Sequence, residues 1–276
     1  MSIKLDPNIN SLSNQSPLSD VIGYEFNEVF PDEIIQKIFF TLKDSELGKC
    51  HRVCKHWKVL ASDEAFLKTR YPATAFGEDK WKAIGKIGQV PRLPNNINEI
   101  LEGPCPIYPG KKIKETHILA YKPKQVNEQP LTVNNIGKLF PIQGKATGYK
   151  YIWDAIVTEH GDTPVEKEEW LLMTKDVLPR SKNKSYIEQQ TLVKSLSEKA
   201  QAEYQVPQLI DAITCIFAEF VSSETRLYSD NPWTYTRCQE KTEGYQVIVG
   251  GFARDGLYVD SDFHFDSGGI GALRKF

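Results

Sequence analysis

Apolar residues at helical spacing dominate one short stretch of this 276-residue chain, Phe30 to Trp57. Pro31 lacks a backbone N–H and has a fixed φ, so it suits the first position of a helix. Asp32 and Glu33 follow it, where the positive end of the helix dipole favours acids. The apolar positions then predict three short helices with a bend before the third: Ile34, Ile35, Ile38, Phe39, Leu42, Leu47, Cys50, Val53, Cys54, Trp57 and Leu60. A unit this small exposes apolar surface and is typical of a segment that needs a partner.

The order of these residues resembles an F-box. The family pattern is Leu-Pro, an acidic residue, paired aliphatics, an Ile, a Leu and later Val-Cys-x-x-Trp. Here the matching residues are Phe30-Pro31, Glu33, Ile34-Ile35, Ile38, Leu42, Leu47 and Val53-Cys54-Lys55-His56-Trp57. Phe30 replaces the usual Leu, and the likeness covers Gly23 to about Tyr71, roughly a sixth of the chain.

The resemblance implies a substrate-recognition adaptor of an SCF-type cullin ubiquitin ligase, which binds Skp1 through the F-box and a target protein through the rest of the chain. It also implies that seven residues either contact Skp1 or pack inside the F-box: Pro31, Ile34, Ile35, Ile38, Leu47, Val53 and Trp57. The sequence does not separate these two roles. Neither catalysis nor a cofactor is expected, because the ligase activity belongs to partners. The layout and the tail NPWTYTRCQEK…VIVGGF…ALRKF also look similar to short F-box proteins of intracellular bacteria, which implies work in host cytosol.

The charge, the apolar runs and the cysteine content of the chain argue against several classes of function. The formal net charge of −2 gives no general attraction to nucleic acid or to an anionic membrane. No apolar run is long enough to cross a bilayer, and the N-terminus has no apolar signal segment. Five cysteines without regular spacing argue against a disulfide framework, so a reducing, cytoplasmic compartment is expected.

Changes in composition divide the chain into four expected parts: a flexible leader at 1–22, the F-box at 23–72, a Pro/Gly-rich connector at 73–111 and an α+β domain at 112–276. The last part is the expected target-binding region. The chain lacks internal repeats, which excludes leucine-rich, WD40 and kelch arrays.

In the expected α+β domain, segments with the two-residue period of strands alternate with segments that have the 3.6-residue period of helices. Strands are predicted by alternation at 116–121, 149–157, 170–173, 233–238, 245–252, 257–265 and 270–273, whereas 131–140 is ambiguous. Between them, Ser185 and Glu188 have the spacing of a capping box that starts one helix. Pro207 marks the start of a second helix with a wide apolar stripe. Strands, two consecutive helices and strands again predict an α+β fold with a mostly antiparallel sheet.

One predicted strand carries a second functional hypothesis. The face opposite its apolar residues holds Tyr258, Asp260, Asp262 and His264, with Asp266 just beyond. Carboxylates and an imidazole at period two are able to hold a divalent cation or perform acid–base chemistry. An enzyme would bring this face into a pocket with Asp154, Glu169 or Cys238. A solvated outer strand face is the ordinary interpretation of the same pattern.

The remaining chemical motifs are weaker. Cys50-His51-x-x-Cys54-x-His56 lacks the haem pattern, and on a helix His51 points about 100° away from Cys50, so no metal site is expected. Cys215 and Cys238 lack a nucleophile motif and are expected to be buried thiols rather than partners of His160 or His264. A third possibility is that the first three helices bury their apolar faces wholly inside this same chain.

Overall fold

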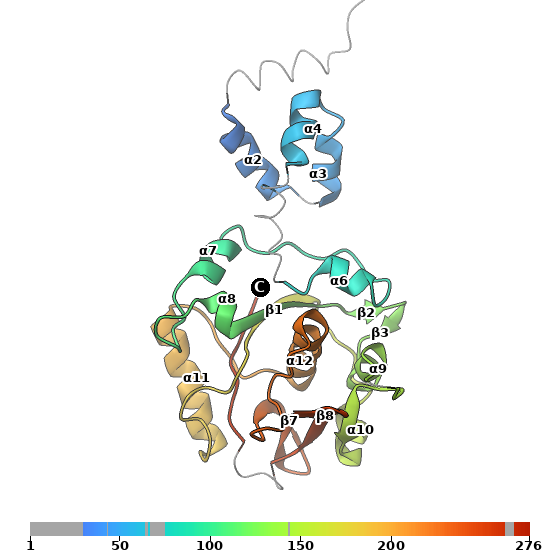
Figure 1. The fold of residues 1–276 in the computed structure, drawn as a ribbon, viewed down its shortest axis with the longest axis vertical. Helices are drawn as coiled ribbons and strands as arrows, with labels where there is room; N and C mark the ends of the chain where they lie inside the picture. Colours follow the sequence, from blue (N-terminus) through green and yellow to red (C-terminus); the bar gives the residue numbers. More distant parts are fainter. Residues whose placement is uncertain (1–29, 43, 64–65, 67–74, 143, 263–267) are drawn as a thin grey trace, which may run out of the picture. The chain divides into compact units, whose positions relative to one another are not determined.

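A computed structural model describes residues 30–42, 44–63, 66, 75–142, 144–262 and 268–276 (Figure 1). The chain divides into two compact units, Met1–Pro72 and Ala73–Phe276. Each unit has an apolar core of its own.

The first unit contains the three predicted helices, α2 (Asp32–Thr41), α3 (Asp44–Cys50) and α4 (Lys55–Ala61). Pro31 is the residue just before α2 rather than its first helical residue, and Asp32 and Glu33 occupy the first turn. Phe39 is central, because its ring packs edge-on against Trp57 at 5.1 Å and Phe66 at 6.4 Å between centroids. The core of this unit comprises Ile35, Phe39, Leu47, Cys50, Leu60, Ala61 and Phe66.

The second unit is α+β, as predicted, and its strands form two larger sheets and one hairpin. The three-stranded sheet is antiparallel, in the order β1 (His117–Lys122), β5 (Glu169–Thr174) and β9 (Leu273–Lys275). The four-stranded sheet has the order β4 (Tyr149–Ile152), β8 (Gly256–Ser261), β7 (Tyr245–Ala253) and β6 (Tyr235–Thr242). Only its β4–β8 pair is parallel. The hairpin joins β2 (Gln125–Val126) and β3 (Gln129–Pro130).

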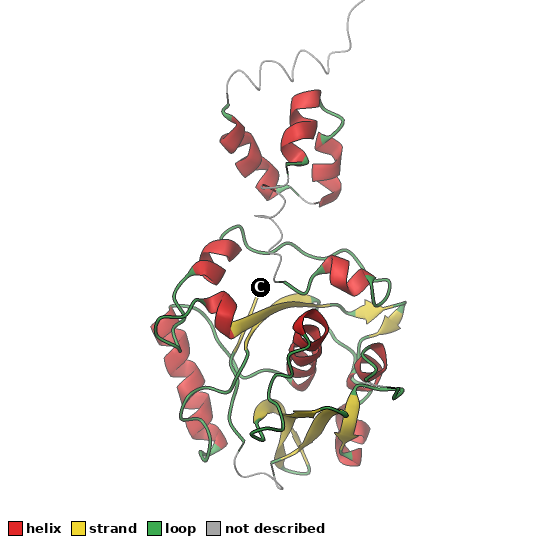
Figure 2. Cartoon of the chain, viewed as in Figure 1, coloured by secondary structure: helices red, strands yellow, loops and turns green. Residues whose placement is uncertain are grey.

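Helix α12 (Leu209–Ser223) lies between the two larger sheets and contacts strands of both (Figures 1 and 2). Its wide apolar stripe explains this position, because a helix that is apolar over most of its surface is stable only when covered. The Phe217 ring stacks on Phe140 at 5.2 Å and meets Tyr149 and Phe252 at 5.7 and 6.0 Å. The other helices are α6 (Glu78–Lys82), α7 (Ile97–Glu102), α8 (Ile113–Thr116), α9 (Val133–Leu139), α10 (Asp154–His160) and α11 (Tyr186–Ala200).

The capping box of α11 is confirmed. The Glu188 backbone N–H donates to Ser185 Oγ at 3.3 Å, and the Ser185 backbone N–H donates to Glu188 Oε2 at 2.9 Å. These two bonds satisfy donors at a helix end that otherwise lack partners.

The Pro/Gly-rich segment after residue 75 packs into the second unit. The Phe76 backbone bonds to β1 on both sides, donating to Leu119 O and accepting from Tyr121 N. Trp81 is fully buried, and its indole N–H donates to Tyr121 O at 2.8 Å. The segment therefore contributes to the core of this unit.

The prediction of a single strand over 149–157 was wrong. The strand ends at Ile152, and α10 begins two residues later. The reason is that Trp153 donates its backbone N–H to Val259 O while its carbonyl starts helical bonds to Ile156 and Val157. The fully buried side chain of Ile156 then fixes α10 against the core.

Smaller boundaries also differ from the sequence predictions. The strand predicted from Trp233 begins at Tyr235, and the one predicted at 270–273 begins at Leu273. Strand β8 ends at Ser261, and residues 263–265 of the predicted strand lie outside the described residues.

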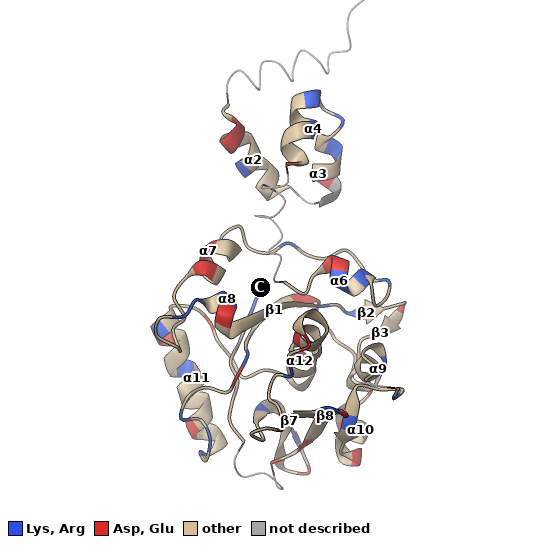
Figure 3. Ribbon diagram, in the orientation of Figure 1, with Lys and Arg blue, Asp and Glu red and all other residues tan. Residues whose placement is uncertain are grey.

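Basic and acidic residues occur together on α2 of the first unit and α6 of the second, whereas α7 carries acidic residues and no Lys or Arg (Figure 3). Within the described ranges, no helix combines the length and the apolar character needed to span a bilayer.

Candidate functional site

The first unit separates the seven predicted contact residues into buried and exposed ones. Ile35 (0% exposed) and Leu47 (6%) belong to the core of the unit. Pro31 and Ile34 are exposed, the latter at 37%. The remaining three, Ile38, Val53 and Trp57, are half-buried.

Two of the three large exposed apolar side chains in the described part of the first unit, Phe30 and Ile34, lie where α2 begins, and the third is Val59 of α4. Phe30 is 37% exposed and directly precedes Pro31 and the first turn of α2, which carries Ile34. We call Phe30, Pro31 and Ile34 the α2 patch. A single exposed apolar residue is ordinary, but three along one helix start form a surface that a partner is able to cover.

Cys54 and His56 stabilise the helices of the first unit. Cys54 Sγ accepts the backbone N–H of Trp57 at 3.4 Å and so caps α4. His56 Nε2 lies 2.8 Å from Asp32 Oδ1, which links α4 to α2. Cys50 is buried, and burial raises the pKa of its thiol. Across the described ranges, no three His, Cys, Asp or Glu side chains come together in a geometry that could hold a metal ion.

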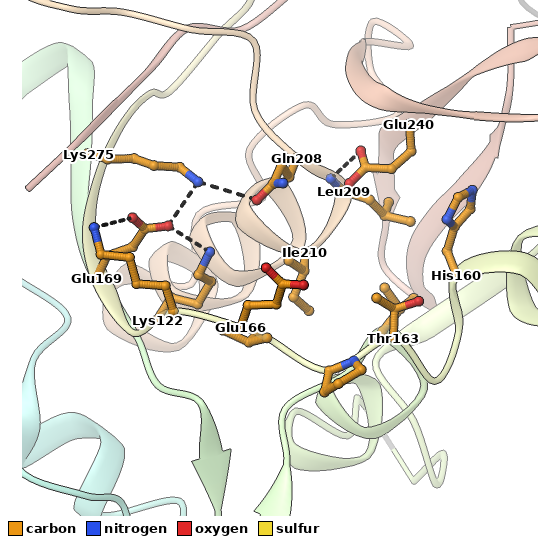
Figure 4. Close-up of a pocket in the computed structure, with 14 residues that line it drawn as sticks. Lys122, His160, Thr163, Glu166, Glu169, Gln208, Leu209, Ile210, Glu240 and Lys275 are labelled. Atoms are coloured by element: carbon orange, nitrogen blue, oxygen red, sulfur yellow. Dashed lines mark hydrogen bonds and ion pairs between the residues drawn. The ribbon is translucent and has the colours of Figure 1, made fainter.

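The second unit contains a pocket of about 460 Å³ beside the start of α12 (Figure 4). This volume lies within the range of small-ligand sites. The lining residues come from β1, β5, β6, β9, α9, the segment 160–169 and the start of α12: Lys122, Val133, His160, Thr163, Pro164, Val165, Glu166, Lys167, Glu169, Gln208, Leu209, Ile210, Glu240 and Lys275.

One side of this pocket rests on a tetrad of charged residues, Lys122, Glu169, Asp211 and Lys275. Lys122 Nζ lies 2.5 Å from Asp211 Oδ1 and 3.1 Å from Glu169 Oε1. Lys275 Nζ lies 2.9 Å from Asp211 Oδ2 and 2.9 Å from Glu169 Oε1. Two lysines and two carboxylates balance, so the tetrad is neutral as a whole.

Attraction within the tetrad outweighs the effect of burial at Glu169 and Lys275. Burial alone would raise the pKa of Glu169, but Lys275 and Lys122 outweigh it and hold the pKa below its ordinary value. Burial alone would lower the pKa of Lys275, but Asp211 and Glu169 leave it raised. The tetrad therefore acts as a cross-link between three strands and α12.

The opposite side of the pocket has a carboxyl at the helix start. Glu240 Oε2 accepts the backbone N–H of Leu209 at 2.8 Å, and burial raises the pKa of Glu240. His160 Nε2 lies 2.9 Å from Lys241 O. These polar groups already have internal partners, so the pocket offers a shaped recess rather than an assembled acid–base pair.

The described acids of the strand face, Asp260 and Asp262, do not line this pocket. Asp260 is 8% exposed, and its Oδ1 accepts the Ser261 backbone N–H. Asp262 accepts from Arg237 Nε at 3.1 Å and from Gln246 N at 3.0 Å. The interpretation as a solvated face was therefore wrong for Asp260, which is buried. His264 and Asp266 lie outside the described residues.

An enzyme was expected to bring the acidic strand face into a pocket with Asp154, Glu169 or Cys238, and the structure shows only part of this arrangement. The described lining of the pocket includes Glu169 but not Asp154, Cys238 or Asp260. Cys215 and Cys238 are fully buried, and burial raises the pKa of both thiols.

Sequence reasoning missed the tetrad residues Lys122, Asp211 and Lys275. A faint signal exists in Asp211, an acid within the otherwise apolar run LIDAITCIF, and in Lys122, a lysine at the end of a buried strand. Charges in such places are rarely buried without a partner.

Residues 29–71 match the family model described as F-box-like. No curated protein and no solved structure matches the chain.

Proposed function

We propose, from the F-box-like domain at residues 29–71, that this chain is a substrate-recognition adaptor of an SCF-type cullin ubiquitin ligase. An F-box-like domain suggests a Skp1-binding adaptor and belongs to a family that is generally non-catalytic. The first unit binds Skp1, and the second unit binds a target protein.

The observation that carries the proposal is the α2 patch. The first unit has a filled core around Phe39, yet Phe30 and Ile34 remain 37% exposed. Covering apolar surface is worth about 25 cal/mol per Å² before association costs. A partner that buries the patch therefore gains free energy that the unit cannot gain alone.

The structure suggests different roles for the seven predicted residues. Pro31 and Ile34 make direct Skp1 contact, because both are exposed. Ile35 and Leu47 shape the surface from inside, because they are buried in the unit. The half-buried residues contribute one side to the core and one side to the interface: Ile38, Val53 and Trp57.

Binding to purified Skp1, measured by calorimetry, tests the proposal. The variant Pro31→Ala/Ile34→Asp should weaken binding by at least about 30-fold, since an interface anchor is worth roughly 2 kcal/mol or more. Val59→Asp is the matched control, because it makes the same apolar-to-acid change at a 67% exposed residue of α4 outside the seven positions. Absence of wild-type binding would overturn the proposal, as would equal losses in both variants.

The cellular setting follows from the same proposal. An adaptor of this ligase works in the cytoplasm, and in host cytosol if the likeness to effectors of intracellular bacteria reflects its origin. The enzyme hypothesis loses its main support, because Asp260 and Asp262 are engaged with their own sheet rather than with the pocket.

A further inference from the structure

A row of residues crosses the four-stranded sheet of the second unit from edge to edge. Tyr151 of β4 pairs with Tyr258 of β8, Tyr258 pairs with Gly250 of β7, and Gly250 pairs with Tyr235 of β6. Directly paired residues point to the same face of a sheet. Three of the four strands thus present an aromatic ring in one line.

Trp233 supplies a fourth ring beside β7, the strand that contributes Gly250 to this line. Its ring stacks on Tyr235 at 5.9 Å with an interplanar angle of 11°, and meets Tyr258 edge-on at 5.7 Å. Tyr151 lies 5.9 Å from Tyr258. Gly251 leaves the necessary room, because a Cβ there would lie 2.6 Å from the Trp233 ring and 2.6 Å from the Tyr235 hydroxyl. We call Tyr151, Tyr258, Trp233 and Tyr235 the aromatic row.

The aromatic row lies on the solvent side of the sheet. Leu257 and Val259 flank Tyr258 in β8 and point into the core. Trp233 is 51% exposed and Tyr151 is 42% exposed, whereas Tyr258 is half-buried and Tyr235, stacked on Trp233, is only 2% exposed. Exposed Trp and Tyr held rigid by neighbouring rings are the residues that most often carry protein-binding energy.

The row already binds one cation of the chain itself. Lys150 Nζ lies 5.1 Å from the centre of the Tyr258 ring and 3.2 Å from Asp255 Oδ1. An ammonium group between an aromatic face and a carboxylate is a cation–π arrangement. The more exposed rings of Trp233 and Tyr151 are able to bind a cationic side chain of another protein in the same way.

Two carboxylates beside the exposed Tyr151 ring favour such a cation. Burial, Asp260 and Asp154 raise the pKa of Tyr151, so both carboxylates lie near that ring. The lysines nearby lie on the other side of the row, where Lys150 and Lys145 share Asp255, and near Trp233, where Lys182 Nζ lies 3.4 Å from the Thr234 hydroxyl. Carboxylates beside the ring disfavour a polyanion such as single-stranded RNA, although RNA also stacks on sheet aromatics.

We propose that the aromatic row is the surface on which the second unit holds a basic segment of its target, with arginine or lysine side chains over the rings of Trp233 and Tyr151. The proposal rests on the adaptor function and names the chemistry of the partner. Arginine fits best, because its planar guanidinium stacks on aromatic faces.

Titration of the full chain with the peptide (Arg-Gly-Gly)₃, followed by calorimetry, tests the proposal. The peptides (Gln-Gly-Gly)₃ and (Glu-Gly-Gly)₃ and a 12-nucleotide single-stranded RNA serve as comparison ligands. Trp233→Ala and Tyr151→Ala should each weaken binding of the arginine peptide about tenfold. Tyr151→Phe, which keeps the ring, should restore binding to within twofold.

Tyr245→Ala is the matched control, because Tyr245 is also 41% exposed but lies at the start of β7, outside the row. It should bind the arginine peptide like the wild type. Binding that survives Trp233→Ala, binding of RNA in place of the arginine peptide, or no binding of any ligand would overturn the proposal.

Skp1 titration of the same variants separates this proposal from the adaptor function. Trp233→Ala should bind Skp1 like the wild type, because the row lies in the second unit. Loss of Skp1 binding in the wild-type chain would overturn the adaptor function, while the peptide titration would still report on the row.

Discussion

Ile34 and Ile35 are consecutive residues of α2, but Ile34 is 37% exposed and Ile35 is completely buried. A helix turns about 100° per residue, so neighbours in sequence face different surroundings. Ile35→Ala should destabilise the first unit by about 2–4 kcal/mol through the cavity it leaves. Ile34→Ala should change its stability by less than about 0.5 kcal/mol.

Hydrogen exchange of the amides in α2, α3 and α4 measures this difference within the first unit. Ile35→Ala should accelerate exchange across these helices, and Ile34→Ala should leave it unchanged. Equal exchange rates in the two variants would contradict the division into core and surface residues. Exchange in α12 serves as the internal control, because that helix belongs to the other unit.

Removal of one tetrad charge should be costly. Lys122 and Asp211 have side chains that are 3% and 0% exposed, and Lys122→Met leaves the buried Asp211 carboxylate with Lys275, which it shares with Glu169. We expect a loss of about 3–5 kcal/mol in the free energy of unfolding. Urea denaturation of the second unit measures it.

Two comparison variants make this prediction specific. Lys86→Met breaks a pair with Glu128 whose side chains are 77% and 76% exposed, and should cost less than about 1 kcal/mol. Lys122→Met/Asp211→Leu, which removes one charge of each sign, should recover most of the loss. If the single and double variants were equally unstable, the cost would come from packing and not from an unpaired charge.

Local signals were readable from the sequence, and long-range pairings were not. The capping box of Ser185 and Glu188 involves residues three apart, so its spacing is enough to predict the start of α11. In contrast, the alternation from residue 149 continues past the end of β4, and only the contact of Trp153 with Val259 turns the chain into α10.

The candidate sites show the same limit. The order of residues 30–57 led to the F-box resemblance, which the family match at 29–71 confirms. Periodicity alone did not divide Ile34 from Ile35, because both lie within a broad apolar stripe. The tetrad joins residues 122, 169, 211 and 275, and the aromatic row joins rings of β4, β6 and β8. Such sites depend on strand register, which no short stretch of sequence contains.

Gly48 and Gly137 both lie in helices, but substitution by Ala should act in opposite directions. A Cβ at Gly48 would have no neighbour within 4 Å, so Gly48→Ala should stabilise the first unit by up to about 1 kcal/mol. A Cβ at Gly137 would overlap the Tyr149 ring, so Gly137→Ala should destabilise the second unit despite the better helix propensity of Ala.

Thermal unfolding of the two glycine variants measures both signs. Gly137→Ala/Tyr149→Leu removes the overlapping ring atoms, although it also removes the bond from the Tyr149 hydroxyl to Val133 O. It should be less unstable than the sum of the two single variants. Simple additivity would show that the ring does not limit the space at residue 137.

The buried histidine of β1 makes the stability of the second unit depend on pH. His117 is 2% exposed, and burial lowers its pKa from 6.5 to about 4. Its Nδ1 lies 2.9 Å from Thr116 Oγ1 and its Nε2 lies 3.5 Å from the Tyr204 hydroxyl. The unfolded chain therefore binds a proton at this residue below about pH 6.5, whereas the folded chain does so only near pH 4.

Stability should consequently fall as the pH falls from 6.5 to 4, with this residue contributing about 3 kcal/mol, and the contribution should level off below pH 4. Urea denaturation at a series of pH values measures the slope, and His117→Gln should make the slope shallower across this window. His51→Gln, at an exposed histidine of the first unit, should leave the slope of the second unit unchanged. A His117→Gln profile parallel to the wild type would show that His117 takes up its proton equally in the folded and unfolded chain, which its burial argues against.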